Sequence, residues 1–229
     1  MNQDKYVFTQ LTDFLPYEEF KYVVKKHKGN KGVRDFTCWN QLLMMMLMMF
    51  GQLSSCESMR DLCILIDAHY QKAYRLGFGK SVVLSTLARA NANRSYKIFE
   101  EFASLDCKST KMLCRYCDLD LKVDGRVYAL DSSNISLCLN VFWQATYKRP
   151  KGAIKLYTLY DIRTQIPDFV IVTPASVNDV NGMELINYQQ GSYYIFDRGY
   201  NDFARLYNIH IHKAFFVFRA WDGVKFRRI

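Results

Sequence analysis

Apolar side chains in the first 120 residues recur at the spacing of amphipathic helices. The pattern predicts helices over residues 17–24, 39–53, 59–70 and 85–102. Pro16 suits the first turn of the first helix, and the second is apolar nearly all round, which is typical of a helix at the centre of a core. Ser85 or Thr86 is positioned to cap the last one. The front of the chain is therefore expected to be an all-helical domain, residues 1–122.

The hydrophobic period changes after residue 122. Short β-rich runs predict strands over residues 127–131, 154–162, 169–173, 193–197 and 215–218. Residues 180–190 can hold a helix, and Asn201 can cap another that begins near Asp202. Residues 123–229 are therefore expected to form a mixed sheet with helices. The fold class is α+β or α/β, with two domains that meet near residue 122.

Composition and charge narrow the possible partners. Half of the 229 residues are apolar and 23% are charged, which is ordinary for a globular chain. The formal net charge of +9 points to a polyanion, with nucleic acid ahead of a membrane surface. The longest apolar run, residues 42–50, is about half as long as a membrane span requires. Seven cysteines without the spacing of a disulfide framework indicate a reduced, cytoplasmic protein.

Two basic segments are candidates for contact with DNA. Residues 21–34 contain six Lys or Arg and no acid, and residues 148–155 are basic and follow Trp143 and Tyr147. Cations can follow phosphates while aromatic rings stack on bases, although a solvated surface is the alternative for any run of charge. The candidate DNA-binding residues are Lys25, Lys26, Lys28, Lys31, Arg34, Lys148, Arg149, Lys151, Lys155 and Arg198.

Two predicted strands end in an aspartate, Asp131 in one and Asp197 in the other. A carboxylate at the end of a buried strand is costly to desolvate unless it has a cation as partner. If the two strands are neighbours, both carboxylates meet at one edge of the sheet. Mg²⁺ prefers such hard oxygen ligands, so the pair suits a divalent-ion site for phosphoryl transfer. The alternative is that each aspartate caps a turn or a following helix.

Several segments resemble bacterial DDE transposases of the insertion-sequence-four group. Three of them lie in the second half, at residues 130–139 (LDSSNISLCL), 151–161 (KGAIKLYTLYD) and 194–203 (YIFDRGYNDF). Upstream, residues 36–42, 50–53, 58–62 and 85–91 are similar to the helical domain of that group. The segments follow the order of the family over nearly the whole chain.

The resemblance implies a helical DNA-binding domain followed by part of an RNase H-like core. It makes Asp131 and Asp197 the first two catalytic residues, which hold two Mg²⁺ (or Mn²⁺) ions for attack on a phosphodiester. The implied function is transposition and recombination of insertion-element DNA. The implied setting is a homo-oligomer on duplex DNA, in the bacterial cytoplasm at the nucleoid, with no membrane partner.

The downstream part of the family pattern is missing, namely the catalytic Glu with the Arg and Lys of its signature. The group carries its third metal ligand, a Glu, in a downstream Tyr-x-x-Arg-x-x-x-Glu signature, and this chain has no Glu after Glu184. The core is therefore expected to be truncated at its C-terminus, and the chain is expected to be inactive in DNA cleavage by itself. The alternative function is that of a non-catalytic, DNA-binding remnant of a transposase.

Overall fold

The computed structural model of the chain describes residues 6–52, 58–78, 82–113, 123–137, 152–219 and 223. The chain divides into two compact units, Met1–Asp106 and Cys107–Ile229. The division lies within helix α7 (Lys97–Leu113), whereas the boundary expected near residue 122 falls outside the described residues. Among the helices described, none has the length and apolar character that a membrane crossing requires.

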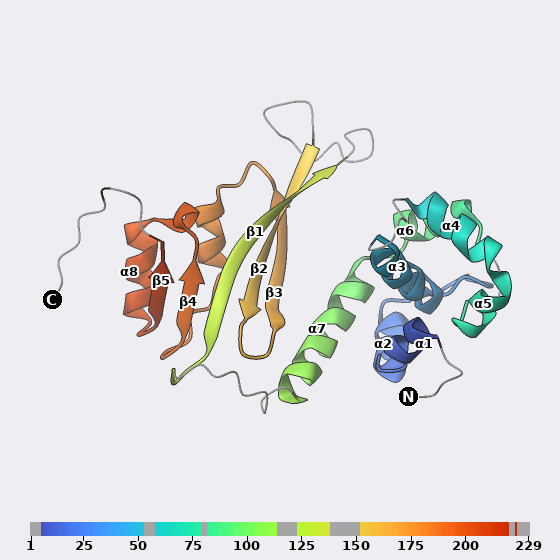
Figure 1. Cartoon of the computed structure of the whole chain (residues 1–229), viewed down its shortest axis with the longest axis horizontal. Helices are drawn as coiled ribbons and strands as arrows, with labels where there is room; N and C mark the ends of the chain where they lie inside the picture. Colours follow the sequence, from blue (N-terminus) through green and yellow to red (C-terminus); the bar gives the residue numbers. More distant parts are fainter. Residues whose placement is uncertain are drawn as a thin grey trace. The chain divides into compact units, whose positions relative to one another are not determined.

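The described part of the first unit is helical, as the sequence predicts. Before α7 its helices, coloured blue to green in Figure 1, are α1 (Val7–Thr12), α2 (Tyr17–Lys26), α3 (Cys38–Gln52), α4 (Met59–Ala68), α5 (Tyr70–Arg75) and α6 (Leu84–Asn93). One apolar cluster joins α3, α4 and α6 and contains Leu43, Leu62 and Leu87. A second joins α2 to α7, where the rings of Phe20 and Phe102 meet edge to face with centroids 4.9 Å apart. The prediction of a buried central helix is confirmed for the first half of α3, where Leu43 and Met44 are buried, whereas Met49 and Phe50 near its end are exposed.

The single helix predicted over residues 85–102 is wrong. The chain leaves helical geometry at Arg94, whose backbone is extended with φ −81° and ψ 143°, and α7 begins only at residue 97. The Arg94 guanidinium donates hydrogen bonds to the carbonyl oxygens of Phe36 and Thr37. The spacing of apolar residues along the chain cannot predict this long-range contact. Helix α6 also begins before Ser85 and Thr86, its predicted caps, with Val83 at the N-cap position.

The second unit contains one five-stranded sheet. Its strands are β1 (Val127–Leu137), β2 (Gly152–Asp161), β3 (Ile166–Pro174), β4 (Tyr193–Phe196) and β5 (Phe215–Phe218), in the spatial order β3-β2-β1-β4-β5 (Figure 1). Strands β1, β2 and β3 are antiparallel neighbours, whereas β4 and β5 continue the sheet in parallel with β1. This mixed sheet is α+β in class and is consistent with the expected RNase H-like core.

Short helical segments connect the later strands. Residues 180–190 do not form the predicted α-helix, because only the 3₁₀ segment η2 (Asp179–Leu185) is helical there. A second 3₁₀ turn, η3 (Arg198–Tyr200), follows β4 and leads into α8 (Phe203–Ile211). The cap of α8 is Asp202 and not Asn201, since the Asp202 side chain accepts a hydrogen bond from the backbone N–H of Arg205.

The two faces of the sheet differ in their cover. Tyr128 and Leu130 of β1 pack with Tyr194 of β4 in an apolar core that η2 and α8 complete with Met183 and Ile209. Side chains alternate between faces along a strand, so the neighbouring positions lie on the opposite face. Apolar side chains of that face are half exposed in the described structure, namely Val170, Val172, Phe215 and Val217.

Candidate active site

Asp131 lies in β1, just after the point where β1 stops pairing with β4 while its pairing with β2 continues. On one side it is paired with Thr158 of β2. On the other side the pairing of β1 with β4 ends one residue earlier, at Leu130 and Phe196. The prediction that the strand ends at Asp131 is wrong, because pairing with β2 carries β1 on to residue 137. Asp131 is nevertheless exposed, since no strand continues beside it on the β4 side.

Asp197 follows β4 directly and begins the turn η3. Its backbone is still extended, with φ −76° and ψ 175°. Its Oδ1 atom accepts a hydrogen bond of 2.8 Å from the backbone N–H of Gly199. A Cβ atom at Gly199 would lie 3.0 Å from that oxygen, so glycine lets the turn close tightly around the carboxylate. Asp197 therefore acts as a cap, and the same hydrogen bond fixes the orientation of its exposed side chain.

The register of β1 and β4 brings the two aspartates to neighbouring positions. The parallel pairing joins Val127 to Tyr193 and continues to Leu130 and Phe196, a constant offset of 66 residues. Asp131 and Asp197 are the next two residues at that same offset. Neighbouring strands lie about 4.8 Å apart and matched residues share a face of the sheet. The predicted adjacency of the two strands is confirmed, whereas the distance between the carboxylates stays a prediction.

The side chains at this edge of the sheet are of the type that binds a divalent cation. Two exposed carboxylates supply hard oxygen ligands of the type that Mg²⁺ and Mn²⁺ take. Within the described ranges, no three side chains of His, Cys, Asp or Glu come together as a metal-binding group. Asp131 and Asp197 thus remain two candidate ligands, and no third carboxylate, His or Cys joins them among the residues that the structure describes.

An ion pair between a buried lysine and a half-buried aspartate lies on the other face of the sheet, behind the candidate site. The ammonium group of Lys155 on β2 is 2.7 Å from Oδ1 of Asp179 and donates to the carbonyl oxygen of Val177 at 2.6 Å. Ser132, the residue after Asp131, donates its hydroxyl to Asp179 at 2.6 Å. Burial would raise the pKa of Asp179, but the hydrogen bonds from Lys155 and Ser132 outweigh it and lower the pKa below its ordinary value.

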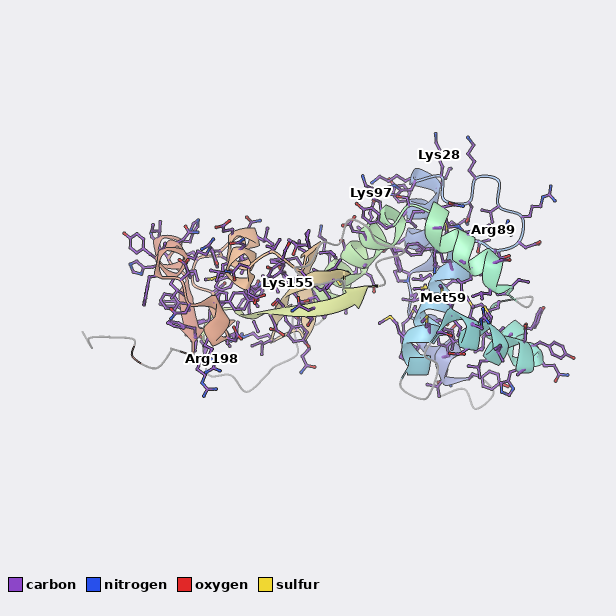
Figure 2. All side chains as sticks on the ribbon, turned by 90° about the horizontal axis from the view of Figure 1, so that it is seen from above. Lys28, Met59, Arg89, Lys97, Lys155 and Arg198 are labelled. Carbon is purple, nitrogen blue, oxygen red and sulfur yellow. The ribbon has the colours of Figure 1, made fainter. Side chains whose placement is uncertain are left out.

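This finding corrects the role expected of Lys155. Its exposed fraction is 5%, and its ammonium group is held by Asp179 and a carbonyl oxygen. A phosphate would have to displace both partners, so we remove Lys155 from the candidate DNA contacts. In Figure 2 Lys155 lies among the strands, whereas Arg198 points outward from the unit. Arg198 is exposed and stands next to Asp197, where a phosphate near the carboxylates would be within its reach.

Two buried tyrosines support the residues around the site. Tyr157 on β2 donates its hydroxyl to the carbonyl oxygen of Asn178 at 2.8 Å, which fixes the start of η2. Tyr200 in η3 is only 2% exposed. Burial raises the pKa of Tyr200, and the negative charges of Asp179 and Asp131 act in the same direction. Tyr200 packs in the same apolar core as Leu130 of β1 and Met183 of η2, so β1, η2 and η3 meet here.

The basic residues predicted in the helical unit lie on its surface. Lys25, Lys28, Lys31 and Arg34 are exposed. Lys26 is exposed as well but forms a 2.6 Å ion pair with Glu101, whose other oxygen lies 2.7 Å from Nε2 of His27. The remaining candidates, Lys148, Arg149 and Lys151, lie outside the described residues.

Sequence reasoning missed the Asp179–Lys155 pair. The two residues lie 24 positions apart, and no local period connects them. A usable signal was present, because a lysine near the start of the apolar run 154–162 needs an anionic partner if its strand is buried. In the folded chain that anion comes from another element, the start of η2.

The two units match two different family models. Residues 122–229 match the model described as Transposase DDE domain, and residues 3–79 match Domain of unknown function (DUF4372). Over 135 residues the chain is 33% identical to a protein of Sinorhizobium fredii named "Putative transposase y4zB", an alignment that covers 58% of this chain and 36% of that protein. The chain thus spans about a third of the length of that relative. No solved structure matches the chain. The second half of the chain is thus similar to transposase DDE domains.

Proposed function

We propose that this chain is part of a DDE transposase of the insertion-sequence-four group. It would bind insertion-element DNA and take part in DNA cleavage and strand transfer, as a homo-oligomer in the bacterial cytoplasm. One observation supports the proposal: β1 and β4 pair up to Leu130 and Phe196, the residues just before Asp131 and Asp197, within the region that matches a DDE domain. The resemblance noted in the sequence assigns the same two residues to catalysis.

In the proposed site each of a few residues has a distinct role. Asp131 and Asp197 would hold the ions, and divalent ions in such a site activate the attacking oxygen and stabilise the leaving oxygen of a phosphodiester. The Gly199 N–H keeps the Asp197 carboxylate oriented. Arg198 is placed to attract the phosphate that the ions act on. Lys155 acts from behind the sheet, because it holds Asp179 and, through it, Ser132 next to Asp131.

Metal binding tests the assignment of the two aspartates. We expect the dissociation constant for Mn²⁺, measured by electron paramagnetic resonance, to rise at least about tenfold in Asp131→Asn and in Asp197→Asn. Asp124→Asn is the matched control, since Asp124 is an exposed aspartate of the same unit just before β1. Equal Mn²⁺ affinity in all four proteins, or no Mn²⁺ binding by the parent chain, would reject the site.

DNA binding by the helical unit is the second part of the proposal. Exposed cations at Lys25, Lys28, Lys31 and Arg34 would displace counterions condensed on duplex DNA. Replacing Lys25, Lys28 and Arg34 by Ala leaves up to three phosphates without a protein cation. The slope of log K against log salt should flatten by about 0.9 for each of these phosphates. Arg60→Ala, an exposed arginine on α4, is the control. An unchanged slope in the triple variant would assign these residues to an ordinary solvated surface.

A non-catalytic DNA-binding protein is the second candidate function. The observation that favours it is the absence of a third ligand beside Asp131 and Asp197 among the described residues. DNA binding without Mg²⁺-dependent nicking of supercoiled plasmid would support this alternative. Nicking that disappears in Asp131→Asn would support the enzyme.

A further inference from the structure

The surface of α6 has the side chains of a helix that reads DNA bases. Leu87 and Ala90 fix it in the core of the helical unit. Its exposed positions hold only short polar side chains, alanines and one arginine, namely Ser85, Ala88, Arg89, Asn91, Ala92 and Asn93. The small residues allow the helix backbone to come close to a partner. In the major groove arginine can make two hydrogen bonds to guanine, and asparagine can make two to adenine.

The charge around α6 favours an anionic partner. Residues 68–99 contain six Lys or Arg and no Asp or Glu. This stretch is as free of acid as residues 21–34, and it lies in a different part of the sequence. The two stretches are brought together by folding, because α6 and the loop after α2 line the same cleft.

That cleft has a volume of about 1010 Å³ and lies wholly within the helical unit. Thr86, Arg89 and Asn93 line it from α6, about one helical turn apart, and Lys28, Lys31 and Arg34 line it from the loop. Among the residues that line it, Asp35 is the one carboxylate. Figure 2 shows Lys28 and Arg89 on the same side of the helical unit.

The loop and the helix are held in fixed positions relative to one another. Arg94, at the end of α6, donates hydrogen bonds to the carbonyl oxygens of Thr37 at 3.0 Å and of the Gln41 side chain at 2.9 Å. Gln41 in turn donates to the side chain of Asn91 at 2.6 Å. Gly29 lies so close to the core that a Cβ atom would come within 2.5 Å of the Ile98 side chain. The backbone that carries the cations is therefore positioned before DNA arrives, which reduces the entropy lost on binding.

We propose that α6 enters the major groove of duplex DNA and that one sugar-phosphate strand bordering the groove occupies the cleft. Arg89 and Asn93 contact base edges, and Lys28, Lys31 and Arg34 contact phosphates of that strand. The dimensions agree, because an α-helix with its side chains is about 10–12 Å across and the major groove is about 12 Å wide. The inference rests on the proposed function, since it identifies where that function meets DNA.

The first experiment separates base reading from phosphate contact. The full chain selects its preferred sequence from a pool of random duplexes of about 20 base pairs, and fluorescence anisotropy then compares that duplex with a scrambled one. We expect Arg89→Ala to weaken binding to the selected duplex by about 5- to 150-fold, which is the discrimination of one bidentate contact. Its binding to the scrambled duplex should change less than about twofold. Arg60→Ala, an exposed arginine on α4, should match the parent on both.

Variants of the loop, in contrast to Arg89→Ala, should weaken binding regardless of the DNA sequence. Lys28→Ala with Lys31→Ala should weaken binding to both duplexes alike and flatten the salt slope by about 1.8, or about 0.9 per phosphate. Methylation of guanine N7, which projects into the major groove, should interfere with binding by the parent and no longer by Arg89→Ala. Circular dichroism melting of each variant checks that the exposed substitutions leave the fold intact.

The outcomes distinguish this inference from the function on which it rests. If the parent binds DNA but Arg89→Ala and Asn93→Ala keep its preference and affinity, α6 is not the reading helix, although DNA binding stands. Binding without any sequence preference, or a preference for single-stranded DNA, would also overturn the inference. If the parent binds no DNA, both the inference and the DNA-binding part of the proposed function fail.

Discussion

Replacing Asp179 by Asn should destabilise the sheet unit by leaving the Lys155 charge buried without its counterion. The Lys155 side chain is 6% exposed, and its ammonium group has the Asp179 carboxylate at 2.7 Å and the Val177 carbonyl at 2.6 Å. Breaking a fully buried ion pair costs about 3–5 kcal/mol. The Asp179 side chain is 42% exposed, so water already screens part of the interaction. We therefore expect a loss of about 2 kcal/mol in Asp179→Asn.

The matching change at Lys155 provides the internal test. In the double variant Lys155→Met with Asp179→Asn, neither charge remains, and methionine fills much of the space of the lysine chain. Its free energy of unfolding should return to within about 1 kcal/mol of the parent. Lys155→Met alone should cost less than Asp179→Asn, since the carboxylate that it leaves unpaired can reach water and still accepts from Ser132.

Hydrogen exchange measured by mass spectrometry can follow this loss in one unit of the chain. A change of about 2 kcal/mol corresponds to about a 30-fold faster exchange of the most protected amides. The acceleration should appear in peptides from β1, β2 and β3, and peptides from α2 and α3 serve as the internal reference. An acceleration below about twofold in Asp179→Asn, or a double variant as unstable as the sum of the two single ones, would refute the reasoning.

Three further predictions concern other contacts. Gly182→Ala should destabilise the sheet unit by about 1–3 kcal/mol in urea unfolding, because the new Cβ would lie 2.5 Å from the buried Tyr157 ring; a neutral effect would show that η2 can move away. The lowered pKa of Asp179 means that its stabilisation is complete above its ordinary value of 3.8 and is lost as the pH falls through the lower folded value. Acid unfolding of the sheet should thus be shallower below about pH 4 in Asp179→Asn, and identical profiles would contradict this. Arg94→Ala should expose the amides of residues 29–37 to exchange, because it frees the carbonyl of Phe36; unchanged protection there would exclude Arg94 as the anchor.

Local sequence patterns were sufficient for most elements of the fold. The apolar helix around Leu43 and the five β-rich runs correspond to α3 and to the five strands. Burial follows directly from such patterns, because an apolar stripe must be covered wherever the chain places it. The failures occurred where a distant partner decided the outcome. Arg94 interrupts a helix to bind the loop at residues 36 and 37, and β2 extends β1 past Asp131.

To identify the candidate sites, both the sequence and the tertiary structure were needed. The sequence by itself determined the types of side chain, since the two aspartates after apolar runs and the acid-free basic stretches can be read without coordinates. Only the tertiary structure decided which of them meet. The parallel register aligns β1 with β4 up to the residues just before Asp131 and Asp197, the ion pair with Asp179 withdraws Lys155 from the surface, and α6 joins Arg89 to the cations of a loop far earlier in the chain. The physical reason is that pairing across a sheet and packing between helices depend on contacts between residues far apart in the chain, which no local period of hydrophobicity encodes.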